Sequence, residues 1–392
     1  MRGLLANLRY WQAQTAVIND DIIRDLDPDF PNVLQAVEMG LVLAETWRET
    51  AVLILQCFFW VEGSGRVPQW RPLLEKCLAV RSAPDEWLEF RLLKQLGQIQ
   101  RLQWQLPTAV ATFQQAGTLA QGLQDNQAIA EIHMNLCQTY QSQHQYDKAE
   151  AEGTQALALF TEAQPRLKAI TLQSLGHIAR EQGHYDLAET RFQQALALTH
   201  SSHTPSITDA IRTMNGLASM YQEQKQYERA ERLYQETVDL LANTTKAEDK
   251  IRAALNQGSL YYDWQKFDQA QAVFRQAEHM LAQQKGMIWL KGIVTNDLGC
   301  VLRHQQEWSM AERYLQESIT LFQQAEDDLM LANTVGNLAD LYLDQGAHEQ
   351  ALSRFDEAIQ LAARFPQNNW AKSQIADYTE KIRGLGRTEQ KG

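Results

Sequence analysis

The sequence predicts an all-α fold, a right-handed superhelical solenoid of antiparallel helix pairs. Three observations predict it. The chain of 392 residues is rich in Ala, Leu, Gln and Glu, which favour helices, and it has no clear β-rich stretch. Pro is scarce, with 9 residues, so long helices can run uninterrupted. A short phrase also recurs along most of the chain at a nearly constant spacing, which is typical of stacked helical hairpins.

The recurring phrase is an aromatic residue followed three positions later by Ala, as in Tyr146-x-x-Ala149 and Tyr185-x-x-Ala188. With its variants included, the alanines stand 39 to 42 residues apart. They are Ala109, Ala149, Ala188, Ala230, Ala270, Ala311 and Ala351. This period fits one helical hairpin per unit, which cannot bury its own apolar face and gains a core only by stacking on its neighbours.

Two further positions keep the same frame. Twelve residues before each Ala stands a small residue, such as Gly97 or Gly176, and four residues after most of them comes a large apolar one, such as Phe113 or Phe192. Residues three and four apart share one face of a helix. We therefore expect the small residues where the two backbones of a hairpin cross closely, and the large ones in the gap to the next hairpin.

This pattern resembles the tetratricopeptide repeat, and seven such units cover residues 88–363. The units are longer than the usual form of about 34 residues, so they are similar to the longer repeats of kinesin light chains and of bacterial sensor-type regulators. The resemblance implies a scaffold that binds other proteins. It also implies that the first helix of each pair lines the concave side of the solenoid.

The two ends depart from the repeat. Residues 1–87 are predicted to form a helical cap that includes a degenerate eighth repeat, in which Trp70 replaces the Ala and Cys77 takes the second small position. Residues 364–384 are predicted to hold a capping helix, which Asn368 or the next residue can begin. Residues 385–392 are predicted to be a polar tail.

Part of this cap resembles the helical segment that joins the ATPase core to the repeats in STAND signalling ATPases. The matching stretches are residues 27–37, Phe59-Trp60-Val61-x-Gly63 and residues 73–78. No G-x-x-x-x-G-K-[ST] loop occurs, so we expect no ATPase core in this chain. The alternatives are a severed sensor arm, a free-standing relative, and an aromatic cap of no special descent.

Other functional classes find little support. His200 and His203 lack a nearby Cys or carboxylate and make a poor metal site, and no nucleophile–base arrangement stands out. We therefore expect no enzyme, no metal and no cofactor. The four Cys lie far apart, as in a reduced helical protein. The longest apolar run, residues 51–61, is too short to span a bilayer, and the N-terminus is a poor signal peptide, so we expect a cytoplasmic protein without a membrane partner.

Charge supplies the main functional clue. The chain carries a formal net charge of −12, yet most of the charged positions expected on the concave side are basic. The basic ones are Arg91, Lys94, Arg101, Arg180, Arg212, Arg252 and Arg303, and the acidic ones are Glu131 and Asp340. A basic groove inside an acidic shell predicts an acidic partner.

A row of amides accompanies these basic positions. It consists of Asn135, Asn215, Asn256, Asn296 and Asn337. An amide both donates and accepts, so such a row can hold an extended backbone regardless of its side chains. Related repeats use asparagines in this way, and the role is carried over as a resemblance. The arginines from Arg180 to Arg303 can then select acidic side chains or a C-terminal carboxylate, or they pair instead with Glu and Asp of adjacent helices.

We therefore predict a non-enzymatic protein–protein interaction scaffold or sensor arm that binds an acidic, extended or helical segment of another protein. A STAND-type or protease effector is the candidate partner. One alternative is a regulator that binds a small effector or signalling peptide, which a deep pocket near His177, Tyr262 and Arg303 would favour. A second alternative, a nucleic-acid binder, is disfavoured by the acidic exterior.

Overall fold

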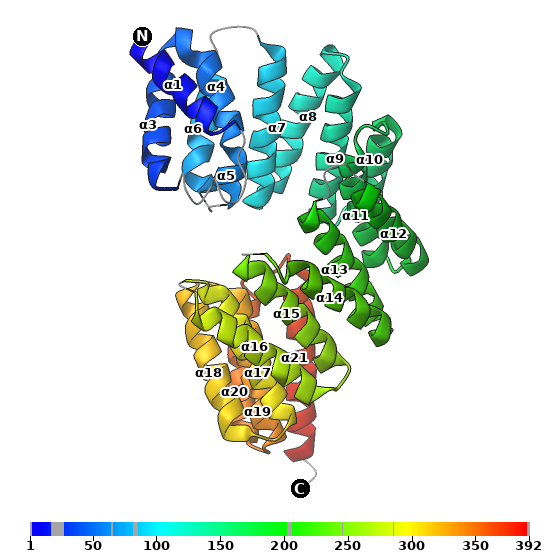
Figure 1. The fold of residues 1–392 in the computed structure, drawn as a ribbon. Helices are drawn as coiled ribbons and strands as arrows, with labels where there is room; N and C mark the ends of the chain where they lie inside the picture. Colours follow the sequence, from blue (N-terminus) through cyan, green and yellow to red (C-terminus); the bar gives the residue numbers. More distant parts are fainter. Residues whose placement is uncertain are drawn as a thin grey trace. The chain divides into compact units, whose positions relative to one another are not determined.

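The computed structural model describes residues 2–16, 27–63, 66–80, 85–201, 206–244, 246–284 and 286–389. Within these ranges the regular elements are helices and no strand occurs, which confirms the all-α prediction (Figure 1). The helices from residue 86 onward form antiparallel pairs, as the repeat frame predicts. The chain divides into two compact units, Met1–Thr213 and Met214–Gly392, and each is described by itself.

The first unit starts with a group of helices that precede the repeats. They are α1 (Arg2–Gln14), η1 (Asp27–Asp29), α3 (Phe30–Gly40), η2 (Ala44–Thr46), α4 (Trp47–Gln56), α5 (Phe58–Gly63) and α6 (Val67–Ala79). Repeat hairpins follow: α7 (Glu86–Leu102) with α8 (Leu106–Gly122), α9 (Asn126–Ser142) with α10 (Tyr146–Leu159), and α11 (Pro165–Glu181) with α12 (Tyr185–Ser201). Helix α13 (Ile207–Glu223) contains the division between the units.

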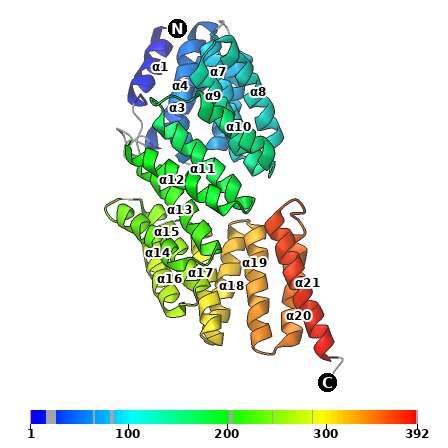
Figure 2. The same cartoon turned by 90° about the vertical axis from the view of Figure 1, so that its right-hand side faces the viewer.

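The second unit continues the repeats. Its hairpins pair α13 with α14 (Tyr227–Leu241), α15 (Ala247–Asp263) with α16 (Phe267–Ala282), α17 (Ile288–His304) with α18 (Trp308–Gln324), and α19 (Asp328–Asp344) with α20 (His348–Ala362). A single helix, α21 (Asn369–Glu389), follows them. Successive hairpins of this unit lie side by side in chain order (Figure 2).

The recurring small residues let the two helices of a hairpin approach closely. All seven repeat alanines are completely buried. A side chain added at Gly97 would place its Cβ 2.6 Å from the ring of Phe113, and at Gly176 it would lie 2.9 Å from the ring of Phe192. The large residue therefore packs on the small residue of its own hairpin, where the missing Cβ leaves room for a ring. Phe113 also belongs to a buried cluster with Ile132 and Leu136 of the next hairpin, in agreement with the expectation that the large residues fill the gap between hairpins.

Most hairpin turns close in the same way with different residues. One residue in each turn has a positive φ, and it is glycine at Gly183 and Gly346 but Trp104, Lys225 or Gln265 elsewhere. The next N–H reaches back five residues to a carbonyl of the first helix, as from Gln105 to Gln100 at 2.8 Å and from Lys266 to Tyr261 at 2.8 Å. This is the Schellman ending of a helix, which satisfies carbonyls that would otherwise lack donors.

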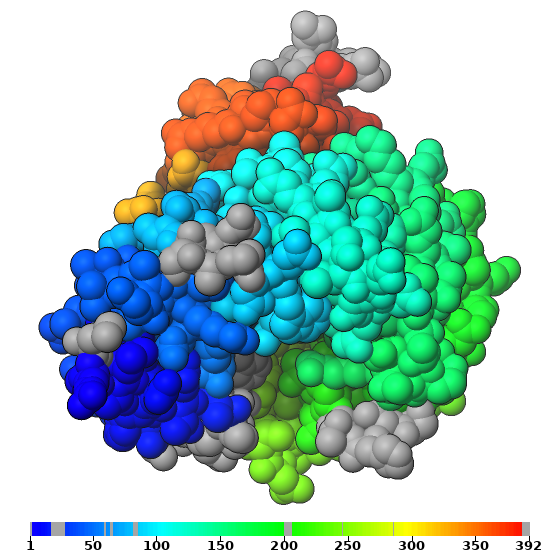
Figure 3. Space-filling view, turned by 90° about the horizontal axis from the view of Figure 1, so that it is seen from above, coloured from blue at the N-terminus to red at the C-terminus, as the bar shows by residue number. Residues whose placement is uncertain are grey.

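The N-terminal helices form an aromatic core that joins the first hairpin. Trp47, Trp60 and Trp70 are fully buried, and the indole N–H of Trp47 donates to the backbone oxygen of Cys77 at 2.8 Å. Gln95 of α7 donates to the backbone oxygen of Leu55 in α4 at 2.9 Å. Figure 3 shows that the surface of this part, in blue, continues into the cyan surface of α7 and α8. The first repeat is thus capped by packed aromatic side chains.

The C-terminal helix is longer than predicted. Asn368 caps it by accepting from the N–H of Ala371 at 3.0 Å, as expected, but α21 runs on to Glu389 into the predicted polar tail. Leu385 is buried there, and this apolar anchor explains the extension. Trp370, by contrast, stays 42% exposed. None of the described helices is long and apolar enough to cross a membrane.

Candidate partner-binding site

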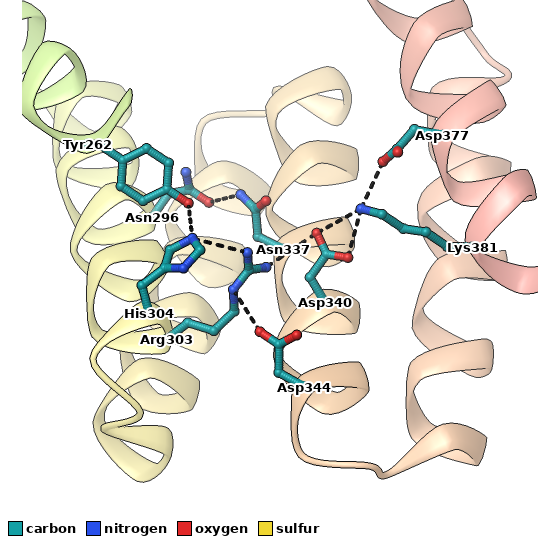
Figure 4. A network of polar contacts seen from close by, with 9 residues as sticks. All are labelled: Tyr262, Asn296, Arg303, His304, Asn337, Asp340, Asp344, Asp377 and Lys381. Atoms are coloured by element: carbon teal, nitrogen blue, oxygen red, sulfur yellow. Dashed lines mark hydrogen bonds and ion pairs between the residues drawn. The ribbon is translucent and has the colours of Figure 1, made fainter. Parts of the chain in front are cut away.

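Polar side chains on successive first helices of the second unit bond to one another (Figure 4). The Nδ2 of Asn337 in α19 donates to the Oδ1 of Asn296 in α17 at 2.8 Å. Gln374 in α21 likewise donates to Asn333 in α19 at 2.9 Å. Because equivalent positions on stacked helices face each other, the repeat frame itself generates these contacts. The predicted amides Asn296 and Asn337 are therefore engaged with each other.

Arg303 belongs to the same network. Its Nη1 lies 3.3 Å from a carboxylate oxygen of Asp340, and its Nε lies 3.4 Å from one of Asp344. Lys381 of α21 donates to Asp340 at 2.8 Å and also pairs with Asp377 at 2.9 Å. The Arg303 side chain is only 13% exposed. Of the two alternatives for this predicted site residue, internal pairing is the one observed.

Tyr262 is also occupied by a neighbour. Its hydroxyl lies 2.8 Å from Nε2 of His304, and Arg303 Nη2 lies 3.5 Å from the same nitrogen. Burial lowers the pKa of His304, and the adjacent Arg303 lowers it further. Since a guanidinium only donates, Nε2 acts as the acceptor and the Tyr262 hydroxyl donates to it. Burial also raises the pKa of Tyr262, so the phenol keeps its proton.

The pattern of mutual bonding is interrupted between α13, α15 and α17. A pocket of about 420 Å³ opens there, between Asn215, Asn256 and Asp297, with Leu255 and Trp289 supplying apolar walls. The Oδ1 of Asn215 is buried and has no hydrogen-bond partner. An unpaired buried acceptor carries a free-energy cost, so a native structure usually supplies it with a water or a ligand. Of the predicted amides, Asn215 therefore combines an unused acceptor with a place on an open pocket.

Arg252 and Trp289 form one wall of this pocket. The Arg252 guanidinium lies 5.6 Å from the centre of the Trp289 ring, and it pairs with Glu248 one turn earlier on α15 at 2.8 Å. The Arg252 side chain remains half exposed. The Trp289 indole donates to Asp327 at 2.9 Å, which fixes the ring. Arg252 can thus turn to an acidic group while its flat face stays near an aromatic surface.

Asp297 also lines this pocket. Burial raises its pKa to about 7, although the Asn296 amide donates to it at 3.1 Å and opposes the rise. Near neutral pH this carboxyl therefore exists in both protonation states. A protonated carboxyl can donate a hydrogen bond to a ligand, whereas an ionised one repels an acidic ligand.

In the first unit, the predicted site residues have neighbours of their own. Asn135 is buried, with its Nδ2 donating to the backbone oxygen of Glu131 at 2.7 Å and its Oδ1 accepting from Gln98 at 3.3 Å. His177 packs edge-on against Phe192 with ring centres 5.0 Å apart. Its pKa is lowered to about 4 by burial, then by the charges of Arg180 and Arg212.

The expected excess of positive charge among these side chains is offset by nearby carboxylates. Glu131 is held by Lys94, and carboxylates outside the predicted positions lie beside the cations. Asp209 is 3.9 Å from Arg212, and Asp344 binds Arg303. In the network of Figure 4, two cations face three aspartates. The sequence count included the arginines but left out Asp209, which lies on the same helix as Arg212, and Asp344, which lies on α19, one repeat after Arg303. The expected stretch from Arg180 to Arg303 also falls on both units.

Several participants were not predicted: Trp289, Asp297, Lys381 and Gln374. A signal for three of them existed. Lys381 and Gln374 stand 41 residues after Asp340 and Asn333, which is one repeat period. Extending the frame into the C-terminal helix would have found both. Asp297 stands 41 residues after Asn256 of the predicted amide row, whereas no repeated position indicated Trp289.

No group of three or more His, Cys, Asp or Glu in the described part of the chain could hold a metal ion. His203 lies outside the described residues, as does the side chain of His200. All four cysteines are free, and burial raises the pKa of each to about 12, so the thiols stay protonated at neutral pH.

The family model for the tetratricopeptide repeat matches residues 128–199, 209–283 and 292–364, more than half of the chain. The chain belongs to the tetratricopeptide repeat family. No curated protein matches it in sequence. The family assignment confirms the resemblance that the repeated alanines indicated.

Similar solved structures support the same fold. The apo form of the quorum sensor NprR from B. thuringiensis is 14% identical with a TM-score of 0.63, and the match covers 92% of this chain and 99% of that one. The apo form of RapI is 13% identical with a TM-score of 0.58, covering 87% and 99%. A Rap protein complexed with competence and sporulation factor is 12% identical with a TM-score of 0.55, covering 87% and 98%. At these identities the likeness concerns the fold alone.

Proposed function

We propose that this tetratricopeptide repeat protein binds a segment of another protein in the pocket between α13, α15 and α17. The observation that carries the proposal is the buried, unpaired Oδ1 of Asn215 at the edge of an open pocket. A peptide N–H is the donor that this acceptor lacks, and the nearby Asn256 amide offers a second backbone contact. An extended segment presents such donors and acceptors at regular intervals, which suits amides on successive helices.

The preference for acidic segments is proposed on Arg252 alone. Its partner Glu248 lies on the same helix at four residues' distance, and both side chains are about half exposed. Such pairs contribute little to stability in water, so exchange of Glu248 for a ligand carboxylate costs little. Arg303 is excluded from this role because two aspartates already hold it.

The structural neighbours agree with a binding function. The Rap structure holds a competence and sporulation factor, and NprR is described as a quorum sensor. A fold of this kind therefore accommodates a signalling factor in at least one relative in structure. We extend this to the present chain as an interaction scaffold or peptide sensor without a reaction of its own. A STAND-type or protease partner and a cytoplasmic location stay predictions from the sequence.

Selection from a displayed random-peptide library tests the proposal. We expect enriched peptides that share an acidic residue and bind the full chain with an affinity that falls as salt rises. The double variant Asn215→Leu/Asn256→Leu should lose about tenfold or more in affinity, because peptide groups then lie in the pocket without partners. Arg252→Glu should remove the acidic preference.

Two matched controls separate the pocket from general effects. Asn126→Leu makes the same chemical change at an exposed position of α9, and Arg313→Glu makes the same charge reversal at an exposed position of α18. Both should bind the selected peptides as the wild type does. Failure to enrich any peptide, or equal binding by the Asn215/Asn256 double variant, contradicts the proposal.

A further inference from the structure

Two pockets of the second unit have matching residues one repeat apart. The first, of about 330 Å³, lies between α14, α15 and α16, and the second, of about 340 Å³, lies between α16 and α17. Six of their lining positions correspond at a spacing of 40 or 41 residues. The pairs are Val238 and Glu278, Leu241 and Leu281, Ala242 and Ala282, Lys250 and Lys291, Ala253 and Val294, and Ala254 and Thr295. The repeat frame therefore produces a similar pocket twice, and we call the two the paired pockets.

The paired pockets lie on the other side of α15 from the pocket between α13, α15 and α17. That earlier pocket takes Arg252, Leu255, Asn256 and Ser259 from α15. The first of the paired pockets takes Lys250, Ala253, Ala254 and Gln257 from the same helix. At about 3.6 residues per turn, the two sets point in nearly opposite directions from the helix axis. A ligand in the paired pockets therefore leaves the pocket at Asn215 open, and neither proposal rests on the other.

The paired pockets combine apolar walls with an open side. Leu241 and Leu281 line them as buried side chains, whereas the next residues, Ala242 and Ala282, are exposed. These small side chains leave the pockets open to solvent. An apolar cavity of about 150 Å³ already holds a benzene ring, so each pocket has room for one large apolar side chain. Moving such a side chain out of water into the pocket is favourable.

A lysine occupies the same position in each pocket. The Nζ of Lys250 donates to the backbone oxygen of Ala242 at 2.8 Å, which uses one of its three N–H donors. The Nζ of Lys291 lies 3.3 Å from a carboxylate oxygen of Glu317 in α18, and both of these side chains are about half exposed. An exposed ion pair of this kind contributes little to stability, so its exchange costs little. Both ammonium groups can therefore bind a carboxylate of a ligand.

We propose that the paired pockets bind one amphipathic helix of another protein, through two large apolar residues seven positions apart and acidic residues beside them. Helices α15 and α17 pack against each other, and the axes of packed helices lie about 8 to 10 Å apart, which sets the separation of the two pockets. Residues i and i+7 of an α-helix share one face and lie about 10.5 Å apart. Residues on one face of an extended strand recur at about 7 and 13 Å, which fits this separation less well.

Selection from a library displayed on a stable helical scaffold, with one helix face randomised, tests the proposal on the full chain. We expect enriched helices that carry large apolar residues at positions i and i+7 and an acidic residue next to one of them. Moving the second apolar residue from i+7 to i+5 should weaken binding about tenfold or more, because the two side chains then point about 140° apart.

Variants at the exposed alanines block the pockets without repacking the core. Ala242→Trp/Ala282→Trp places a large ring at each opening, so the affinity for the selected helices should fall about tenfold or more. The Tm and the far-UV circular dichroism should stay close to those of the wild type. Ala111→Trp/Ala151→Trp makes the same changes at exposed positions of α8 and α10 and should bind the helices as the wild type does.

Variants at the lysines test the charge of the ligand. Lys250→Gln/Lys291→Gln keeps an N–H donor at each position and removes the positive charge. Binding of the selected helices should weaken, and it should lose most of its dependence on salt. Lys372→Gln makes the same change at an exposed position of α21 and should keep both the affinity and its salt dependence.

The possible outcomes separate this site from other uses of the same surface. Enrichment of helices without the i and i+7 pattern, or equal binding by Ala242→Trp/Ala282→Trp, overturns the proposal. Asn215→Leu/Asn256→Leu should bind the selected helices as the wild type does, and a loss there would place them in the other pocket. Self-association of the wild type that Ala242→Trp/Ala282→Trp abolishes, measured by sedimentation velocity, would assign the paired pockets to a second copy of this chain and likewise overturn the proposal.

Discussion

Two stretches of the second unit use the same repeat frame in opposite ways. Between α17, α19 and α21, groove-facing side chains bond to each other, so that Asn296 meets Asn337 and Asp340 meets both Arg303 and Lys381. Between α13 and α15, Asn215 faces an open pocket with its Oδ1 unpaired. Side chains at equivalent positions thus stabilise the stack of helices in one stretch, whereas in the other stretch they can bind a ligand.

The difference shows that a residue's position in the repeat does not by itself decide whether its side chain bonds to the next repeat. The residue 41 positions on is asparagine in both stretches, Asn337 after Asn296 and Asn256 after Asn215. The first pair is hydrogen-bonded, whereas the Oδ1 of Asn215 has no partner. The same two residue types one period apart therefore form a structural contact in one stretch and leave a binding candidate in the other.

The largest expected effect comes from breaking the bonded stretch. Asp340→Ala leaves Arg303 poorly solvated and removes a partner of Lys381. We expect the free energy of unfolding to fall by about 3 kcal/mol, because one side of a largely buried ion pair is lost. Urea denaturation measures this change. Asp356→Ala, at an exposed position of α20, should shift stability by about 0.5 kcal/mol or less, and equal losses in the two variants would disprove the structural role of the network.

The second prediction compares the two amides directly. Asn296→Leu removes both a donor to Asp297 and the acceptor for Asn337, so it should cost about 2 kcal/mol of stability. Asn215→Leu removes an acceptor that has no partner, so stability should stay unchanged or rise slightly. Thermal and urea unfolding of both variants provide the comparison. A similar loss at Asn215 would mean that its side chain is structural as well.

The third prediction is a pH effect in the pocket. Asp297 keeps its proton in the folded chain up to a pKa of about 7, against an ordinary value of 3.8. The folded state therefore binds more protons between these values, so stability falls as pH rises from about 4 to 7. Asp297→Asn should flatten this fall, because the substituted side chain does not titrate in this range.

The matched control for this pH effect is Asp356→Asn, which changes an exposed carboxyl and should leave the pH profile of stability as in the wild type. Peptides selected on the pocket give a second readout. Acidic peptides should bind less tightly above pH 7, where the ionised Asp297 repels them, and Asp297→Asn should remove that decline. An unchanged pH profile in Asp297→Asn would contradict the raised pKa.

Much of the fold could be predicted from the sequence because each repeat unit requires small and large apolar residues at the same positions. The seven alanines are all fully buried, and Gly97 and Gly176 each face a ring of their own hairpin. The period alone fixes which residues occur on a helix face. It does not fix the extension of α21, which depends on the single buried Leu385.

The candidate sites were less predictable, for a different physical reason. The frame indicated which side chains point into the groove, and Asn215, Asn256 and Arg252 do line a pocket. It could not indicate which of them are already bonded, since that depends on the distance between pairs of side chains on neighbouring helices.

The turns between paired helices have a consequence for how such chains diversify. They close through backbone hydrogen bonds, and the residue with positive φ is Gly in two of them and Trp, His, Lys or Gln in others. The turn therefore accepts many different amino acids. Hairpins can be duplicated, exchanged or re-ordered with their linking segments intact, and selection then acts mainly on the exposed faces. Because main-chain hydrogen bonds form the turns, proteins of this architecture can acquire new binding specificities without changes in their turns.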